Sequence, residues 1–285
     1  TISANDLIIN EVMFDPVGTG ADYLEIYNRS GKILDLFDVV LATRKTDGSI
    51  TSSKPFSASS MQMLPDTYLA LTPNKANICN LFICKEEGNL YEMAIPTMAN
   101  ESGTVLIVTK DLQTVIDELT YSYKWHHPMI KNVEGVALER INPEATTQDK
   151  NNWHSASSEV RYGTPGYKNS QYRIPDTTPQ EKAFWLESEV FTPDNDGNND
   201  ILILHYKMPE DGYMANITIY DAMGQAVTKL VSSYLLSAEG TISWDSRTDK
   251  GASANIGVYV IYIEAYNATT GKTLRQKIPC VLSTR

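Results

Sequence analysis

The sequence is poor in positive charge, in cysteine and in long hydrophobic runs. Its 24 Lys and Arg are outnumbered by 35 Asp and Glu, which gives a formal net charge of −11. Neutralising nucleic-acid phosphates requires clustered Lys and Arg, so we expect no nucleic-acid partner. No apolar run approaches the length of a membrane span, so we expect no direct insertion into a membrane. The apolar content of 42% is that of an ordinary globular protein.

The three cysteines are too few for a disulfide framework. Cys79 and Cys84 are separated by four residues, and Cys280 lies in the last strand that we expect. A local Cys79–Cys84 bridge and free buried thiols both fit this spacing. One C-x-x-x-x-C pair without a second pair is poor evidence for zinc.

The chain begins without Met and without an apolar signal segment. A secretory precursor after processing would begin in this way, and so would a trimmed chain. We expect an extracellular, cell-surface or periplasmic protein whose signal peptide has been removed.

Short alternating segments dominate the first half. In residues 22–28, Tyr23, Glu25 and Tyr27 alternate with Leu24 and Ile26, a period of two that predicts a half-buried strand. Turn residues separate the segments, and no long amphipathic helix is convincing. Several short strands of this kind predict a sandwich or a barrel. Further strands are expected at 7–12, 39–42, 68–71, 104–109, 115–119 and 136–141.

Six motifs between residues 5 and 170 stand in the order found in bacterial lamin-tail domains, which this region resembles. The resemblance implies an immunoglobulin-like β-sandwich. In bacteria such modules look like parts of secreted or surface proteins, often attached to hydrolases, and we expect no attached hydrolase here. The motifs are LIINEV (7–12), DYLEIYN (22–28), LPDTYLAL (64–71), GVALER (135–140), NW (152–153) and GTPG (163–166).

The last hundred residues alternate in the same manner at 202–208 and 259–265, and about seven strands predict a second sandwich. This region resembles the Ig-like C-terminal domains of gliding-motility-associated and flagellar hook-cap-type proteins, with Ser246 where Gly is usual. The resemblance implies an exported Bacteroidetes protein, in which such domains sometimes act as sorting signals for type IX secretion. Its motifs are FTPDNDGNND (191–200), IYDAMGQ (219–225), WD (244–245) and GVYV (257–260).

We therefore predict an all-β chain of two tandem immunoglobulin-like β-sandwich domains. The first covers 1–172, the second covers 183–285, and the polar, proline-bearing segment 173–182 links them. Asp176-Thr-Thr in this linker resembles the O-glycosylation sequon of secreted Bacteroidetes proteins. Thr177 is the modification site that the resemblance implies, and an exposed, unmodified Thr is the alternative.

The acidic turn at 191–200 is the sharpest candidate site. Asp194, Asp196, Asn198 and Asp200 offer hard oxygen ligands of the kind that Ca²⁺ prefers. An EF-hand is excluded, because its sixth position would be Asn199 and its twelfth His205. The alternative is an Asx-type turn whose side chains cap backbone N–H groups before the next strand. Glu189 and Asp221 are candidates to complete an ion site.

The aromatic segment 121–128 is a second candidate. Tyr123, Trp125 and His126 could line a surface on which a carbohydrate stacks, and packing at the edge of the core is the alternative. His126 and His127 are adjacent, so on a regular strand they would point to opposite faces and could not bind one ion together.

We expect no enzyme. The sequence contains no G-x-S-x-G elbow and no phosphate-binding loop. Glu11 and Glu25 lie in apolar strands, where an ionised carboxylate needs a partner, and Arg140 is a candidate partner for either. We assign this trio a structural role.

The expected function is adhesion, scaffolding or presentation of a binding surface at the bacterial envelope. The expected partner is an envelope or extracellular protein or glycan, recognised by the sandwich loops. A carbohydrate-binding module that assists a separate hydrolase is one alternative. A second domain that acts mainly as a secretion or anchoring signal is another, and a small hydrolase with an unfamiliar site is a third.

Overall fold

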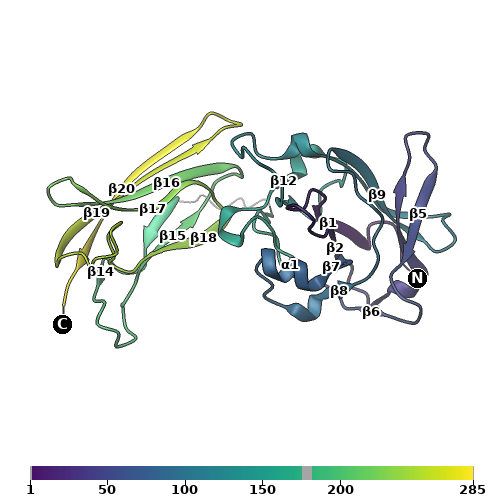
Figure 1. Ribbon diagram of the computed structural model, residues 1–285, viewed down its shortest axis with the longest axis horizontal. Helices are drawn as coiled ribbons and strands as arrows, with labels where there is room; N and C mark the ends of the chain where they lie inside the picture. The colour runs from purple at the N-terminus through teal and green to yellow at the C-terminus, as the bar shows by residue number, and fades with distance from the viewer. Residues whose placement is uncertain (1, 175–181, 285) are drawn as a thin grey trace. The chain divides into compact units, whose positions relative to one another are not determined.

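The computed structural model describes residues 2–174 and 182–284. The chain separates into two compact units, Thr1–Pro175 and Asp176–Arg285, and each is described by itself. Regular structure in both is nearly all β-strand (Figure 1), which confirms the expected all-β fold class. Most of the expected linker, residues 175–181, lies outside the described residues.

The first unit is built on two sheets. Sheet I has the strand order β12–β11–β1–β2–β7–β8 and is antiparallel except for the β7–β8 pair. Sheet II has the order β10–β9–β4–β5. A separate short ladder pairs β3 with β6. The strands are β1 (Leu7–Met13), β2 (Tyr23–Asn28), β3 (Leu34–Asp35), β4 (Val39–Arg44), β5 (Ile50–Pro55), β6 (Gln62–Met63), β7 (Tyr68–Thr72), β8 (Leu90–Glu92), β9 (Ser102–Thr109), β10 (Val115–Ser122), β11 (Leu138–Arg140) and β12 (Trp153–Ser155).

The main core of this unit joins the two sheets. Alternation along the strands points one set of apolar side chains inward, as the period of two predicts. Leu24 and Ile26 of β2 belong to this set, together with Leu41 of β4 and Ile107 of β9. Burying such side chains is the main favourable contribution to folding.

The outer face of sheet I is buried as well. A second apolar cluster there includes Tyr23, Ile78 and Phe82, with Ile78 supplied by helix α1 (Lys75–Leu81). Asn74 caps this helix, because its Oδ1 accepts from the N–H of Asn77 at 3.0 Å. A disulfide between Cys79 and Cys84 ties the helix to the turn after it, so the bridge is the arrangement that the structure adopts. Short 3₁₀ turns complete the unit: η1 (Leu36–Asp38), η2 (Glu87–Asn89), η3 (Tyr123–Trp125), η4 (Lys150–Asn152) and η5 (Ser158–Val160).

One expected strand is shorter than the sequence suggests. Residues 136–141 were expected to be extended throughout, but β11 covers only Leu138–Arg140. Before it, Val136 donates its N–H to Val133 within a turn, and Ala137 donates to the carbonyl of Tyr162. A loop therefore takes the place of a neighbouring strand there.

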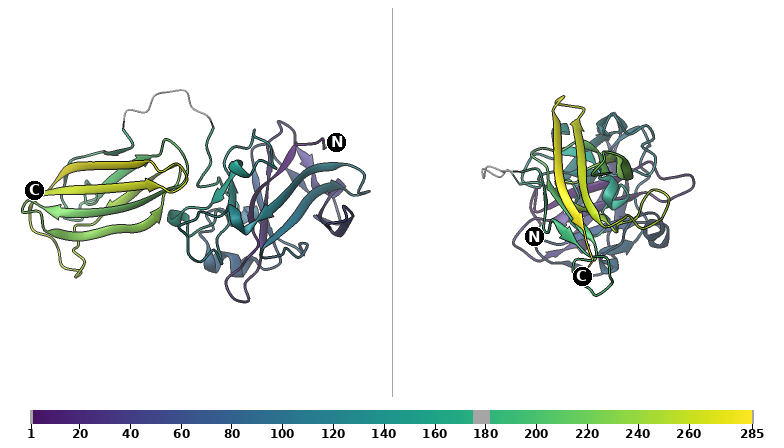
Figure 2. Two further views of the ribbon diagram at one scale, coloured as in Figure 1. Left: turned by 90° about the horizontal axis from the view of Figure 1, so that it is seen from above. Right: turned by 90° about the vertical axis from the view of Figure 1, so that its left-hand side faces the viewer.

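The second unit is a sandwich of three and five strands. Sheet III has the order β13–β15–β18, and sheet IV has the order β14–β20–β19–β16–β17. The long strands β19 and β20 run side by side in both views of Figure 2. The strands are β13 (Phe184–Leu186), β14 (Val190–Phe191), β15 (Leu202–Lys207), β16 (Tyr213–Asp221), β17 (Ala226–Leu235), β18 (Glu239–Trp244), β19 (Gly257–Asn267) and β20 (Thr273–Leu282).

The core of the second unit follows the alternation closely. Leu202, Leu204 and Tyr206 of β15 are buried, while Ile203 between them is exposed. Cys280 is buried in the same core, and burial raises the pKa of its thiol to about 12. This cysteine therefore behaves as a small apolar residue.

Among residues 2–174 and 182–284, no helix is both long enough and apolar enough to cross a bilayer.

Candidate functional site

The acidic turn between β14 and β15 brings three of its four predicted ligands together. One carboxylate oxygen each from Asp194, Asp196 and Asp200 lies within 4.8 Å of the others. Two oxygens on one Ca²⁺ can be up to about 5 Å apart, since each Ca–O distance is about 2.3–2.6 Å. The spacing fits this cation. Glu189 and Asp221, named as candidates to complete the site, do not belong to this group.

Backbone amides also point at these carboxylates. Asp200 accepts from the N–H of Asn195 at 2.6 Å and from the N–H of Gly197 at 2.8 Å. Asn198 takes part through its backbone N–H, which donates to Asp196 Oδ1 at 2.8 Å. The bond from Asn198 to Asp196 is that of an Asx-type turn, and Asp200 satisfies two further backbone N–H groups, so the turn has a structural role without an ion. Calcium binding stays a prediction.

The aromatic segment 121–128 offers little exposed aromatic surface. Tyr123, at the start of η3, is 42% exposed. Trp125 is partly buried and packs against the main core of the first unit, and His126 is buried. Of the three predicted ligand-binding residues, only Tyr123 is thus well exposed to solvent. Carbohydrate binding at this segment stays a prediction.

His126 has a structural environment. Its Nδ1 lies 3.0 Å from the hydroxyl oxygen of Ser155, which also accepts from the N–H of His127 at 2.9 Å. Burial, with a smaller contribution from His154, lowers the pKa of His126 to about 4. The ring is therefore neutral at physiological pH and packs near Phe14, with 5.7 Å between ring centroids.

Thr177, the predicted modification site, lies outside the described residues. Its modification stays a prediction.

Three buried carboxyl groups form a row across sheet I. Glu11 stands directly opposite Glu25 on one side and Glu139 on the other, on adjacent strands β1, β2 and β11. Directly opposite residues share a face, so all three point to the outer side of the sheet. Each is completely buried. Like charges in this arrangement repel one another, which favours protonated carboxyl groups.

Residues 157–171, named here the strap, cover this row. The N–H of Thr164 donates to Glu11 at 2.9 Å, and the N–H of Gly166 donates to Glu25 at 2.7 Å. Glu139 accepts from the N–H of Gln171 at 2.8 Å and from the hydroxyls of Thr164 and Ser170, both at 2.8 Å. The carboxyl groups therefore hold a segment with no strand of its own against the sheet.

Two further residues of the strap, Gly163 and Asn169, help it to lie against the sheet. A Cβ on Gly163 would lie 2.5 Å from the ring of Phe82, so no larger residue fits there without a shift. Asn169 joins the strap to β1, because its side chain donates to the carbonyl of Asn10 at 3.0 Å and accepts from the Asn10 amide at 2.7 Å. Asn10 in turn donates to Glu25 at 2.8 Å.

The pKa values of the three carboxyl groups are raised. Burial is the main cause for each of them. It raises the pKa of Glu25 to about 8, against hydrogen bonds from Asn10 and Gly166 that lower it. For Glu11, the charges of Glu139 and Glu25 add to the increase. At neutral pH Glu25 therefore holds a proton that the same side chain loses in the unfolded chain.

Arg140 does not pair with Glu11 or Glu25, and our expectation on this point is wrong. Successive residues of a strand point to opposite faces, so Arg140 faces the main core when Glu139 faces the strap. Its partner is Asp117 of β10, with Nη1 3.6 Å from Oδ2, and both side chains are buried. Arg140 also donates to the carbonyl of Ile9 at 3.0 Å. The pair links sheets I and II.

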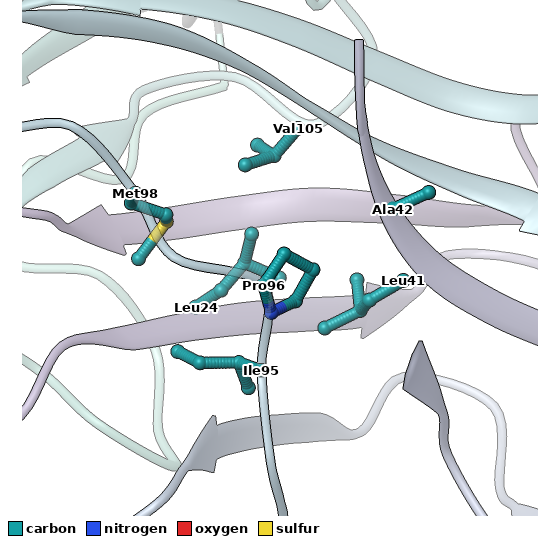
Figure 3. A pocket seen from close by; sticks show the side chains of 7 residues that line it. All are labelled: Leu24, Leu41, Ala42, Ile95, Pro96, Met98 and Val105. Carbon is teal, nitrogen blue, oxygen red and sulfur yellow. The ribbon is translucent and has the colours of Figure 1, made fainter. Parts of the chain in front are cut away.

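A small apolar hollow in the first unit offers no polar recognition. Seven side chains line it, from β2, β4, β9 and the segment 95–98 (Figure 3). None of the seven carries a polar side-chain group that donates or accepts hydrogen bonds, and the space left between them is too small for a water molecule. We regard it as packing of the core. The lining residues are Leu24, Leu41, Ala42, Ile95, Pro96, Met98 and Val105.

The outer face of sheet III carries a residue that our reading of the sequence did not single out. Trp185 is 38% exposed on β13, between buried Phe184 and partly buried Leu186. The alternation of these three residues was the signal for an exposed Trp185, because it points the middle side chain away from the core. We weighed Trp125 as the exposed aromatic instead, since it lies among other aromatic residues in the sequence.

No family model matches the chain, and no curated protein sequence matches it. The resemblances to lamin-tail domains and to the C-terminal domains of gliding-motility-associated proteins therefore stay predictions.

Several solved structures show a distant likeness. Dimeric latent PorU from Porphyromonas gingivalis is 11% identical with a TM-score of 0.28, over 98% of this chain and 20% of PorU. PorZ, a surface component of the type-IX secretion system of Porphyromonas gingivalis, is 10% identical with a TM-score of 0.26, over 96% of this chain and 38% of PorZ. Trypsin-activated alpha-2-macroglobulin from Escherichia coli is 10% identical with a TM-score of 0.25, over 100% of this chain and 16% of that protein. The chain spans well under half the length of each, and likenesses at this level carry no inference about function.

Proposed function

We propose that the chain is a non-catalytic module exported to the bacterial envelope, where it presents binding surfaces to an envelope or extracellular protein or glycan. The burial of Glu11, Glu25 and Glu139 supports this proposal most directly. These three are the natural candidates for acid–base chemistry, because their pKa values are raised. A general acid must come within hydrogen-bond reach of its substrate, yet all three are completely buried and bonded to the strap.

The disulfide supports export. Disulfides persist in oxidising environments such as the periplasm and the cell surface, and are rare in the reducing cytosol. Cys79 and Cys84 are bonded, whereas Cys280 is a buried free thiol. A secreted module with one local bridge fits this pattern.

A calcium ion at Asp194, Asp196 and Asp200 belongs to the same proposal. The 4.8 Å spread of their oxygens supports it, and extracellular calcium would suit a site of low affinity. Backbone carbonyls or water would have to supply the remaining ligands, because three carboxylates alone do not complete the six to eight that Ca²⁺ takes.

Thiol mapping of the protein from its native cells tests export. The cells are lysed in an alkylating reagent without reductant, and the peptides are examined by mass spectrometry. We expect Cys79 and Cys84 to be unreactive until a reductant is added, and Cys280 to react once the chain is unfolded. Alkylated Cys79 and Cys84 in the unreduced sample would contradict export.

A substrate screen tests the non-catalytic part. Phosphoesters and glycosides of many kinds are incubated with the purified chain and with a Glu139→Gln variant. We expect no turnover above buffer from either. Turnover by the parent chain that the variant lacks would show that the buried row is catalytic after all.

A further inference from the structure

The outer face of sheet III presents a group of side chains that no role described above uses. Alternation along β13, β15 and β18 turns them away from the core. We name this surface the Trp185 face. It consists of Trp185, Ile203, His205, Thr241 and Ser243, with Glu187 and the facing pair of Lys207 and Glu239 at its edges.

Trp185 is held in place before any ligand arrives. It stands directly opposite His205, and the two rings are stacked with 5.6 Å between centroids and 12° between planes. In the described residues β13 has one ladder partner, β15, and on its other edge Gln276 of β20 donates its side-chain N–H to the carbonyl of Phe184 at 2.9 Å. The indole is 38% exposed. A ring fixed in this way loses little conformational entropy on binding.

Hydrogen-bonding groups surround the indole. Thr241 stands opposite His205, and Ser243 stands opposite Ile203 on the same face. Both are exposed. Glu187 Oε2 lies 3.6 Å from Nε2 of His205 and is largely exposed. The face thus combines one flat apolar ring with hydroxyl, imidazole and carboxylate groups.

We propose that the Trp185 face binds an uncharged polysaccharide. A pyranose ring has a flat side lined by C–H groups and a rim of hydroxyls. The C–H side stacks on an indole ring, and the rim hydroxyls bond to Thr241, Ser243 and Glu187. The proposal rests on the proposed envelope-binding role and names its ligand class.

Charge and composition favour this occupant over others. A polyanionic glycan would meet Glu187, Glu239 and a chain of net charge −11, and the one Lys of β15 on this face, Lys207, stands opposite Glu239. A membrane surface would require basic residues around a larger apolar area. A protein partner would require a contiguous apolar centre, and here Trp185 and Ile203 are accompanied by polar neighbours.

Affinity electrophoresis of the full chain tests the proposal. Native gels contain barley mixed-linkage β-glucan, xyloglucan or yeast mannan, and one further gel contains anionic alginate. We expect at least one neutral polysaccharide to retard the chain. We expect Trp185→Ala to weaken this binding at least tenfold and His205→Ala to weaken it several-fold, because the indole then loses its stacked neighbour.

One tyrosine variant and one methionine variant serve as controls. Tyr266→Ala removes an aromatic ring that is 42% exposed on β19, and Met223→Ala removes an apolar side chain that is 85% exposed, both elsewhere in the second unit. Both should bind as the parent does. Thermal unfolding verifies that every variant is folded. If Trp185→Ala unfolds, Ile203→Thr is tested in its place, and this variant should also bind the polysaccharide more weakly than the parent.

Several results would overturn the proposal. These are no retardation by any neutral polysaccharide, stronger retardation by alginate, or loss of binding in Tyr266→Ala with retention in Trp185→Ala. Self-association of the chain that Trp185→Ala abolishes, without polysaccharide binding, would assign the face to a second copy. None of these results bears on the thiol mapping, so the envelope proposal stands or fails separately.

Discussion

The two units differ in how much polar material they bury. Within residues 2–174, the first buries five Asp, Glu or Arg side chains: Glu11, Glu25, Asp117, Glu139 and Arg140. In the described part of the second, the buried polar side chains are Thr228, Ser237, Ser246 and Asn267, none of which carries a charge.

Strand length explains the difference. β16, β17, β19 and β20 of the second unit have nine to eleven residues each, so ladder hydrogen bonds satisfy much of their backbone. In the first unit β11 and β12 have three residues each, and the strap has no strand. Buried backbone N–H groups there need other acceptors, and carboxyl groups supply them. Where regular pairing ends, this protein replaces it with buried acids.

The largest expected effect comes from breaking the buried ion pair. Arg140→Leu leaves Asp117 buried without its cation, which should cost about 3–5 kcal/mol of unfolding free energy. Denaturant unfolding of the full chain measures the loss, and hydrogen exchange assigns it to peptides of the first unit. Arg275→Leu is the matched control, because its pair with Glu264 is exposed and worth about 0–1 kcal/mol. Equal losses in the two variants would contradict the comparison.

The second largest expected effect is a dependence of the first unit's stability on pH. The pKa of Glu25 is 4.5 ordinarily and about 8 when folded, so between these values the folded chain keeps a proton that the unfolded chain has lost. Stability present below pH 4.5 is therefore lost as pH rises toward 8, by about 1.4 kcal/mol for each unit of pKa difference. His126 acts in the opposite sense, because its pKa falls from 6.5 to about 4 and its contribution is lost as pH falls through that range.

Glu25→Gln isolates the carboxyl contribution. Whatever its stability at one pH, the variant cannot release a proton at this position, so its unfolding midpoint should decline less than the parent's between pH 5 and pH 8. Calorimetry at three pH values measures the two slopes. Parallel slopes would show that Glu25 does not hold its proton at neutral pH.

The disulfide should matter less than the ion pair. Replacing Cys79 and Cys84 by Ser opens a short loop and should cost the first unit about 2 kcal/mol. Cys280→Ala in the second unit removes one buried sulfur and should cost about 1 kcal/mol. Thermal unfolding of both variants compares them, and a bridge variant as stable as the parent would contradict the expectation.

Calcium should have the smallest effect. Millimolar Ca²⁺ should stabilise the second unit by about 1 kcal/mol or less, following RT ln(1 + [Ca²⁺]/Kd). Asp196→Ala should abolish the gain, while Asp47→Ala, in an exposed turn of the first unit, should keep it. Unfolding curves that superimpose in calcium and in chelator would leave the acidic turn only its role as a cap for β15.

The alternation of apolar and polar residues made the strands predictable. It also placed the Glu25 side chain on the face of its strand that points away from the main core. It did not predict the strap. Residues 157–171 lack a period because their bonds go to side chains of three distant strands. The partner of Arg140 was missed for a related reason. Glu11 and Glu25 were suggested as its partners because they lie in apolar strands and need one. The partner is in fact set by the face of β11 on which Arg140 lies, and that face turns toward Asp117.

The acidic turn shows a different limit. Its sequence predicted closely spaced carboxylates, and the structure gathers three of them. The same residues also predict an Asx-type turn, whose hydrogen bonds are present at Asp194 and Asp196. The same pattern of Asp and Asn residues therefore suits a calcium site and an Asx-type turn equally, and a calcium titration distinguishes the two roles.

The strap also determines how the first unit bears mechanical load. The strap ends at Gln171, and two residues further along the chain the N–H of Arg173 donates to the carbonyl of Ile141 at 2.8 Å. A pull on the chain from the C-terminal side reaches that bond first, then Gln171 on Glu139, and only afterwards the sheets. Tension would therefore detach the strap one bond at a time, from its C-terminal end, while the main core stays folded.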